Sequence, residues 1–129
     1  MAEARRIRTE VFCQEQQVPP DLEWDGLDSA CDHFLIFDGE AAIGVARLRA
    51  YHGMAKIERV AVLAPHRARK AGWVLMEAVL ARAKDKGFAA AVLNAQVAVE
   101  GFYGAMGFIA EGQRFMEADI EHVRMTRRL

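Results

Sequence analysis

The chain has 129 residues and a formal net charge of −1, with 53% apolar and 27% charged residues. This balance excludes disordered and fibrous proteins and disfavours broad, charge-driven nucleic-acid binding. No apolar run approaches the roughly 20 residues that span a bilayer, and residues 1–6 lack the apolar stretch of a signal peptide. We therefore expect one domain over residues 1–129, cytoplasmic, with neither nucleic acid nor membrane as a partner.

The chain holds two cysteines, Cys13 and Cys31. Neither they nor the histidines and acids fall at the spacings that are typical of metal sites. We expect no metal, and thiols that stay reduced.

The first predicted element is a helix over residues 2–16, which Pro19 and Pro20 end because a proline ring fixes φ and removes a backbone donor. Its apolar residues fall on one face at helical spacing, at Ile7, Val11 and Phe12. Its charged residues fall on the other faces, at Arg5, Arg6, Arg8, Glu10 and Glu15. An amphipathic helix that packs on a core is expected at the start of the chain.

The segment over residues 21–32 shows little periodicity and is expected to be a loop. It carries Trp24 together with the acids Glu23, Asp25 and Asp28. A loop held on a rigid scaffold often covers a binding site, whereas acids in loops are more often simply solvated. Both interpretations stay open for this segment.

An antiparallel meander of three strands is expected next, over residues 33–37, 41–50 and 54–63. Turn-forming pairs separate the strands, at Asp38-Gly39 and His52-Gly53. The first half of the chain is therefore predicted to be a helix followed by a small sheet.

The stretch from residue 56 to residue 72 joins the third strand to the main helix. Pro65 ends the strand, and a turn with Arg67, Arg69 and Lys70 leads into the helix. A helix N-terminus presents unpaired N–H groups and partial positive charge, and the three cations add to that field. The turn is either a site for phosphate or a solvated loop that happens to be basic.

The second half alternates helices and strands. The expected elements are a helix over 71–86, a strand over 89–96, a short helix over 98–106, a strand from Phe108 and a last strand over 120–128. The main helix has a buried stripe of Met76, Val79, Leu80 and Ala83, and Gly87 is its left-handed cap. A strand–helix–strand crossover in the middle predicts a single mixed α/β sheet.

The strand over 89–96 places Val92, Asn94 and Gln96 on one face. Buried amides need hydrogen-bond partners, so two of them on one face of an apolar strand are unusual. They indicate either a polar pocket on that face or a structural pair that satisfies itself.

Several motifs in a fixed order give the chain a resemblance to a known family. They are VFCQEQQVPPDLEWDGLD at 11–28, KIERVAVLAPHRARKAGWVLM at 56–76, VLNAQ at 92–96, FYGAMGFIAEG at 102–112 and EHVRM at 121–125. The chain resembles the GCN5-related N-acetyltransferase (GNAT) superfamily, and within it the small bacterial acyltransferases similar to ElaA. The resemblance implies the GNAT fold, here without the leading strand that most relatives have.

The resemblance also implies an N-acetyltransferase that moves an acetyl group from acetyl-CoA to a primary amine. In the family the central strand pairs its exposed backbone with the pantetheine arm, which here assigns that role to Val60, Ala61 and Val62. The turn that wraps the pyrophosphate corresponds to Arg67, Ala68, Arg69, Lys70, Ala71 and Gly72. Gln96 stands where many relatives have an asparagine that contacts the cofactor.

Two side chains match catalytic positions of the family. Tyr103 matches a tyrosine near the CoA sulfur that acts as general acid; the alternative is an aromatic that only packs. Glu58 matches an acidic position on the central strand that often acts as a base through a water molecule; the alternative is a solvated glutamate.

The acceptor pocket is expected to hold Trp24, Asp25, His33, Asn94 and His122. The two histidines are candidate bases because their unperturbed pKa lies near neutrality, although a lone histidine is more often a structural hydrogen-bonding group. The acidic loop favours a cationic acceptor on electrostatic grounds.

The chain departs from the family pattern in two places. The phosphate turn keeps one of the three usual glycines, and Lys70 stands at the middle position. The alternative to an enzyme is therefore a non-catalytic GNAT-like binding module in which Lys70 impairs CoA binding. The absent leading strand leaves a sheet edge unpaired, which predicts a homodimer.

Overall fold

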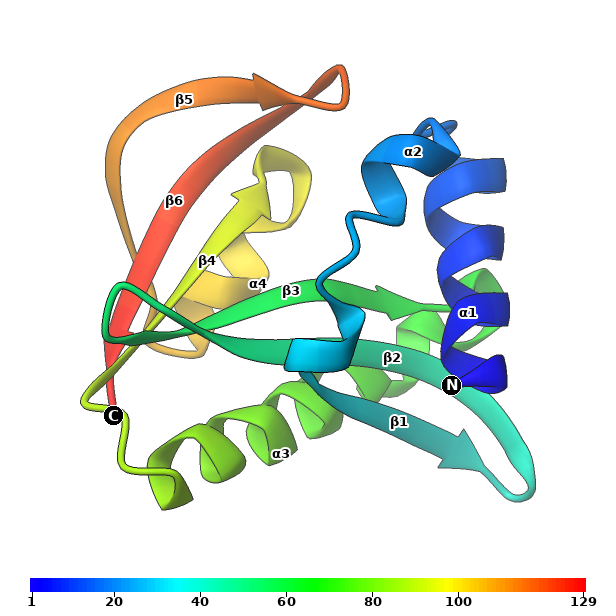
Figure 1. The fold of residues 1–129 in the computed structure, drawn as a ribbon, viewed down its shortest axis with the longest axis horizontal. Helices are drawn as coiled ribbons and strands as arrows, with labels where there is room; N and C mark the ends of the chain where they lie inside the picture. The colour runs from blue at the N-terminus through cyan, green and yellow to red at the C-terminus, as the bar shows by residue number, and fades with distance from the viewer.

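The computed structural model describes residues 1–67 and 70–129, and its centre is one mixed sheet (Figure 1). The strands are β1 (Asp32–Asp38), β2 (Ala41–Tyr51), β3 (Met54–Val62), β4 (Ala90–Gln96), β5 (Ile109–Glu117) and β6 (Ile120–Arg128). They form a six-stranded sheet in the order β1-β2-β3-β4-β6-β5. The single mixed α/β sheet is thereby confirmed, including the meander of the first three strands.

The helices fall between and before these strands. They are α1 (Ala2–Arg8), the π-helix η1 (Thr9–Glu15), α2 (Pro20–Glu23), α3 (Ala71–Asp85), α4 (Glu100–Ala105) and the 3₁₀ helices η2 (Asp28–Ala30), η3 (Ala64–Arg69) and η4 (Val97–Val99). Within the part of the chain that the structure describes, no helix is long and apolar enough to cross a membrane.

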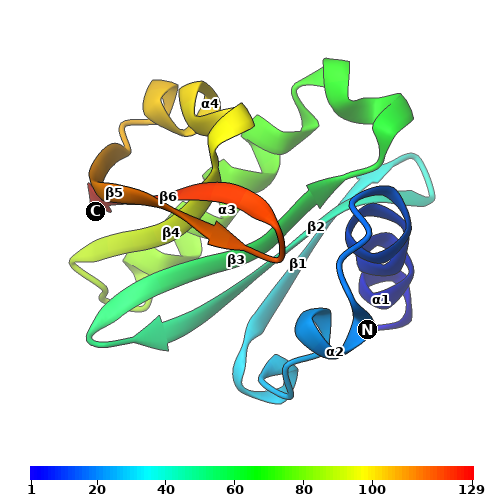
Figure 2. The ribbon, with the colours of Figure 1, turned by 90° about the horizontal axis from the view of Figure 1, so that it is seen from above.

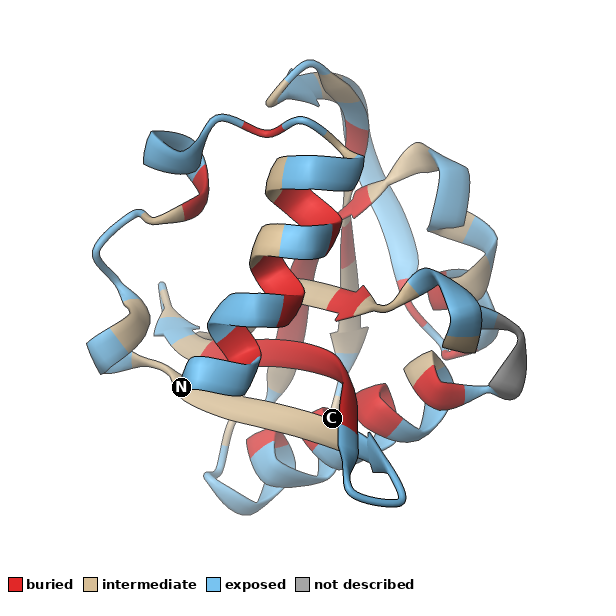
Figure 3. Cartoon of the chain, turned by 90° about the vertical axis from the view of Figure 1, so that its right-hand side faces the viewer, coloured by how far each residue is buried: buried red, intermediate tan, exposed pale blue. Residues whose placement is uncertain are grey.

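Two apolar cores lie on opposite sides of the sheet, and α1 and α3 cover them from either side (Figure 2). The larger core packs the predicted stripe of α3 against Leu48, Ile57 and Leu93. The smaller core packs Ile7, Val11 and Phe12 against β2 and β3, and the buried side of α1 recurs turn by turn in Figure 3. Both predicted helix stripes are therefore confirmed.

The N-terminal helix differs from the prediction in two respects. Its second half is wound more widely, as a π-helix, and it ends at Glu15. Arg8, expected on the polar face, is instead fully buried because its guanidinium is ion-paired with Glu23 and Asp28. The expected loop over 21–32 also carries short helical turns at α2 and η2.

The strand–helix–strand crossover makes β3 and β4 parallel, and the two strands soon part. They pair at Ala55 with Ala91 and at Lys56 with Val92, beyond which β4 turns away from β3 (Figure 1). The β4-facing backbone edge of β3 therefore has no strand partner after Lys56. Such an edge can hydrogen-bond an extended ligand.

A bulge in β3 changes which side chains face which helix. The register between β2 and β3 shifts between Val45 and Arg47, and Arg59 takes a left-handed φ of 57°. One extra residue moves every following side chain to the other face of a sheet. Accordingly Ile57 packs in the core under α3, whereas Ala61 packs in the core under α1.

Candidate active site

A cleft of about 1280 Å³ opens where β3 and β4 part. It collects most of the residues that the sequence predicts for the site. Those that line it are Asp25, Glu58, Val60, Ala61, Val62, Arg67, Lys70, Gly72, Asn94, Gln96, Tyr103 and His122. The motifs that lie far apart in the chain therefore converge on one opening.

Three predicted residues lie away from the lining, and two fall outside the described residues. The Trp24 ring lies against α1, 4.7 and 4.6 Å from the guanidinium carbons of Arg5 and Arg8. His33 belongs to the edge strand β1, where its Nε2 meets the backbone oxygen of Asp28 at 2.8 Å. Ala71 is buried in the protein at the start of α3. Ala68 and Arg69 are the two residues outside the description.

Tyr103 enters the cleft from the side of the sheet that α3 covers. It lies on α4, is 8% exposed, and packs edge-on against Phe102 and Phe108 with ring centroids 5.1 and 6.0 Å away. Burial raises the pKa of Tyr103 to about 12. The phenol is therefore protonated at neutral pH, as a proton donor must be.

Glu58 faces the opposite side of the sheet and is held by three cations. Its carboxylate accepts hydrogen bonds from Arg49 Nε at 2.7 Å and Arg47 Nη2 at 3.0 Å, and Lys56 Nζ lies 3.5 Å away. Burial alone would raise the pKa of Glu58, but the hydrogen bond from Arg49 and the charges of Arg47 and Lys56 hold it below its usual value. Glu58 is thus neither a solvated glutamate nor a strong base.

Two fully buried arginines bind the acids of the segment over 21–32. Arg8 donates to Glu23 at 2.6 Å and to Asp28 at 2.7 Å. Arg47 donates to Asp25 at 2.6 Å and to Asp28 at 3.0 Å. The hydrogen bond from Arg47 lowers the pKa of Asp25 well below its usual range. Glu23, Asp25 and Asp28 are therefore ion-paired and not available as free negative charge for a cationic acceptor.

Arg59, the left-handed residue of the bulge, binds the same segment. Its Nη2 donates to the backbone oxygens of Leu22 and Glu23 at 3.3 and 3.2 Å and to the Asp25 carboxylate at 3.3 Å. Its Nε lies 3.0 Å from Glu23 Oε1. These contacts fix the segment over the charged face of the sheet, beside the cleft.

The predicted phosphate turn keeps a glycine-like backbone although its middle glycine is a lysine. Lys70 has a φ of 58° and directly precedes α3, whose first turn has no side-chain cap. The open N–H groups of that turn suit a phosphate. Arg67, by contrast, donates to the Val62 carbonyl at 2.8 Å and to both carboxylate oxygens of Glu15 at 2.7 Å. The left-handed backbone of Lys70 and the uncapped start of α3 are thus open, while the Arg67 side chain is already engaged.

The two amides of β4 have different surroundings. Gln96 and Gln16 exchange hydrogen bonds of 3.0 and 3.4 Å across the mouth of the cleft, which ties β4 to the end of the N-terminal helix. Asn94 lies deeper along β4 and lines the cleft. The sequence allowed either a polar pocket or a structural pair. Asn94 fits the first alternative because it lines the cleft, whereas Gln96 is paired, though with Gln16 and not with Asn94.

His122 lies beside Gln96 on the neighbouring strand β6. Its Nδ1 is 2.7 Å from the backbone oxygen of Ile120. Because a carbonyl oxygen can only accept, Nδ1 must carry the hydrogen, and the lone pair of the neutral ring is on Nε2. His122 is therefore a second candidate proton acceptor in the cleft.

Sequence reasoning missed the cations of the charged face and the Gln16 partner of Gln96. Arg47 and Arg49 alternate with Leu48 in β2, as Lys56 and Glu58 do with Ile57 in β3. This period of two places all four charges on one face and could have revealed the cluster.

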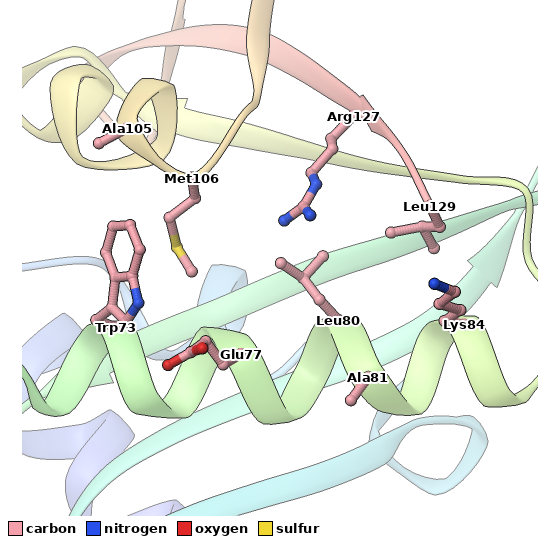
Figure 4. Close-up of a pocket in the computed structure, with 9 residues that line it drawn as sticks. All are labelled: Trp73, Glu77, Leu80, Ala81, Lys84, Ala105, Met106, Arg127 and Leu129. Carbon is pink, nitrogen blue, oxygen red and sulfur yellow. The ribbon is translucent and has the colours of Figure 1, made fainter.

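A second hollow, of about 390 Å³, lies between α3, α4 and the end of β6 (Figure 4). Its wall includes Trp73, Met106 and Arg127. Neither Tyr103 nor Glu58 lines it, so the candidate chemistry belongs to the larger cleft.

Comparisons with known proteins identify the family of the chain. Residues 3–129 match the family model described as an acetyltransferase (GNAT) domain. The chain is 35% identical over 128 residues to the uncharacterized N-acetyltransferase YjcF of Bacillus subtilis, covering 98% of this chain and 91% of that protein.

Two solved structures extend the comparison to the fold. An acyl-CoA N-acyltransferase from Pseudomonas aeruginosa is 32% identical with a TM-score of 0.85, covering 97% of this chain and 88% of that one. Escherichia coli ElaA is 28% identical with a TM-score of 0.86, covering 98% and 88%. The resemblance drawn from the sequence motifs is confirmed: the chain belongs to the GNAT acetyltransferase family, a family of acyltransferases.

Proposed function

We propose that the protein transfers the acetyl group of acetyl-CoA directly to a primary amine. The observation that carries the proposal is the unpaired backbone edge of β3 inside the cleft, with the uncapped start of α3 at one end and Tyr103 beside it. The family and the relative named as an acyl-CoA N-acyltransferase support the choice of co-substrate.

Acetyl-CoA would supply an activated thioester, so the protein mainly has to position the two substrates and move protons. The edge formed by Val60, Ala61 and Val62 would bind the extended arm of the cofactor, and the backbone from Lys70 to Gly72 its pyrophosphate. The amine would form the new C–N bond as the C–S bond breaks.

Tyr103 is the proposed general acid, which gives its proton to the departing sulfur. The proton that the amine loses needs an acceptor, and the cleft offers two. Glu58 is the candidate from the sequence, but its lowered pKa makes it a weak base. His122, with its lone pair on Nε2, is the second candidate, and the pH profiles of Glu58→Gln and His122→Gln distinguish them.

The alternative, a non-catalytic module, depended on Lys70. The left-handed backbone of Lys70 retains the conformation that a glycine would allow. The comparisons give this alternative no support. A cytoplasmic location and a homodimer stay predictions, and light scattering tests the second.

Thermal unfolding with and without acetyl-CoA tests the proposal. A ligand at about 100 times its Kd should stabilise the folded state by about 2.7 kcal/mol, or several degrees in Tm. Tyr103→Phe should keep this shift while kcat falls about 100-fold, because the ring packing survives and the acid is lost. No shift with acetyl-CoA, or full activity in Tyr103→Phe, would contradict the cofactor site or the acid role respectively.

The pKa of Tyr103 adds a pH criterion. Since burial raises that pKa to about 12, the phenol stays protonated on the alkaline side of neutrality. Any fall in kcat below about pH 10 must then come from another group. A fall that disappears in Tyr103→Phe would show that the phenol titrates earlier than its burial indicates.

A further inference from the structure

The charged face of the sheet beside the cleft has unequal numbers of positive and negative groups. The cations that meet there are Arg8, Arg47, Arg49, Lys56 and Arg59. The carboxylates are Glu23, Asp25, Asp28 and Glu58. Among the described residues, five positive side chains therefore share four negative ones.

The surplus can be located within this cluster. Within the cluster, Arg8, Arg47 and Arg59 balance three acids through contacts of 2.6 to 3.3 Å. These acids are Glu23, Asp25 and Asp28. Arg49 and Lys56 meet only Glu58 among the carboxylates of the cluster, at 2.7 and 3.5 Å, and Glu58 is shared with Arg47 at 3.0 Å. One unit of positive charge is thus uncompensated at this pair.

Arg49 and Lys56 are held together at the wall of the cleft. They lie directly opposite each other on β2 and β3, and their side chains are 19% and 14% exposed. The ring of Tyr51 lies under both, 5.2 Å from the guanidinium carbon and 4.4 Å from the ammonium. Both residues line the cleft, at the point where β3 and β4 begin to part.

This pair is at the wrong end of the cleft to serve the cofactor phosphates. The predicted phosphate turn follows Val62, which lies about 20 Å from Lys56 along β3. Arg49 and Lys56 also share the face of Glu58, opposite to the core in which Tyr103 is packed. The uncompensated charge is therefore on the face of the candidate base Glu58, where the amine would lose its proton.

We propose that Arg49 and Lys56 bind an anionic group of the acceptor, a carboxylate or a phosphate, so that the substrate is an amine with an anion at its other end. This inference rests on the proposed acetyl transfer. A largely buried cation without a counter-charge is unfavourable, and an incoming anion would restore neutrality. Arg49 can add a charge-assisted hydrogen bond from the nitrogen that Glu58 leaves free.

The inference reverses the expectation from sequence. The acidic segment suggested a cationic acceptor, but its acids Glu23, Asp25 and Asp28 are matched by arginines of the protein. At the Arg49 and Lys56 end of the cleft, the uncompensated charge is positive.

The test uses matched acceptors with the acetyl-CoA-loaded protein. ω-Amino acids of increasing length are compared with n-alkylamines of the same length, and ω-aminoalkyl phosphates form a third series. CoA release and the additional rise in Tm are measured for each. We expect one anionic series to be preferred at least about tenfold in kcat/KM, and the better series identifies carboxylate or phosphate.

Lys56→Met should abolish that preference, mainly through KM. Because Lys56 also lowers the pKa of Glu58, the readout is the ratio of kcat/KM between the anionic and the alkylamine series within each variant. Met keeps most of the apolar stem, and the surplus charge is removed, so the variant should fold. Lys84→Met, on the exposed side of α3, is the matched control and should keep the preference.

Equal or better use of alkylamines overturns the inference, and so does a preference that survives in both Lys56→Met and Arg49→Met. Failure of every acceptor while acetyl-CoA still raises Tm overturns the anionic acceptor and leaves the cofactor site standing. Absence of any acetyl-CoA shift overturns the proposed function and this inference with it.

Discussion

The same stretch of β2 and β3 forms two very different surfaces. On the side of α3, Leu48 and Ile57 are buried among other apolar side chains. On the opposite side, the neighbouring residues Arg47 and Glu58 are ion-paired with each other, and Arg47 is also paired with Asp25 and Asp28 of the covering segment. Alternate residues of one strand pair therefore meet an apolar core and a charged cluster.

The difference shows which of the two faces needs specific partner residues in order to be stable. Apolar burial is non-directional and tolerates many neighbours, so the α3 face needs only the right pattern. Buried charges need specific partners at hydrogen-bond distance, and removal of one leaves the others uncompensated. The charged face is therefore correctly formed only when the segment over 21–32 is in place.

The largest expected effect comes from the centre of the charged face. Arg47→Leu leaves Asp25, Asp28 and Glu58 close together without their shared cation, and should cost about 3–5 kcal/mol in free energy of unfolding. Leu48→Ala, on the apolar face, should cost a similar 2–5 kcal/mol, roughly, through cavity formation. Urea denaturation at neutral pH measures both.

Acid separates the two variants. The three carboxylates left by Arg47→Leu repel one another only while ionised, so their penalty should shrink as they become protonated near about pH 4. The cost of Leu48→Ala involves no titrating group and should stay constant. If Arg47→Leu lowers the free energy of unfolding equally at neutral pH and at about pH 4, the charge of Arg47 is not what stabilises that face.

An intermediate effect is expected at Arg59. Arg59→Ala loses the contacts to Glu23 and Asp25 and keeps a left-handed φ, which is unfavourable for alanine. Arg59→Gly loses the same contacts but accepts that φ. Glycine should therefore be about 1 kcal/mol more stable than alanine here, although strand interiors usually favour alanine. Thermal unfolding measures both variants. If Arg59→Ala is the more stable of the two, the bulge does not persist in the variants.

The smallest effect is expected at Lys70, which also has a left-handed φ. Within the part of the chain that the structure describes, the Lys70 side chain makes no hydrogen bond or ion pair, so Lys70→Gly should stabilise the fold by about 0.5–1 kcal/mol. Lys84→Gly, inside α3, is the control and should destabilise by about 1 kcal/mol. A loss of stability in Lys70→Gly would show that the lysine side chain makes a stabilising contact. Lys70 would then no longer differ from Arg59, whose side chain is held by ion pairs.

Most of the fold could be predicted because it follows local rules. The stripe of α3, the turn at His52-Gly53 and the left-handed Gly87 each depend on neighbouring residues in the chain. The crossover between β3 and β4 follows from the order of the elements. Nothing in the sequence marks the wider winding of η1, and we have no physical account of it.

The site was predictable where a motif lies on one element, as for Tyr103 on α4 and Val60 on β3. It was not predictable where a role depends on residues far apart. The burial of Arg8 follows from Glu23 across a turn, and the lowered pKa of Glu58 requires the register between β2 and β3. From the helical pattern alone, a charged residue such as Arg8 is predicted to be exposed to solvent, because its ion-pair partner in another segment is not known.

The hydrogen-bonded pair of Gln16 and Gln96 has a consequence for how the protein is made. The two residues are 80 positions apart, so their contact closes a long loop whose entropy cost grows slowly with length. The N-terminal helix leaves the ribosome well before its partner on β4. One wall of the cleft can therefore form only after residue 96 has been synthesised, and a nascent chain shorter than that would display α1 without the site that it helps to enclose.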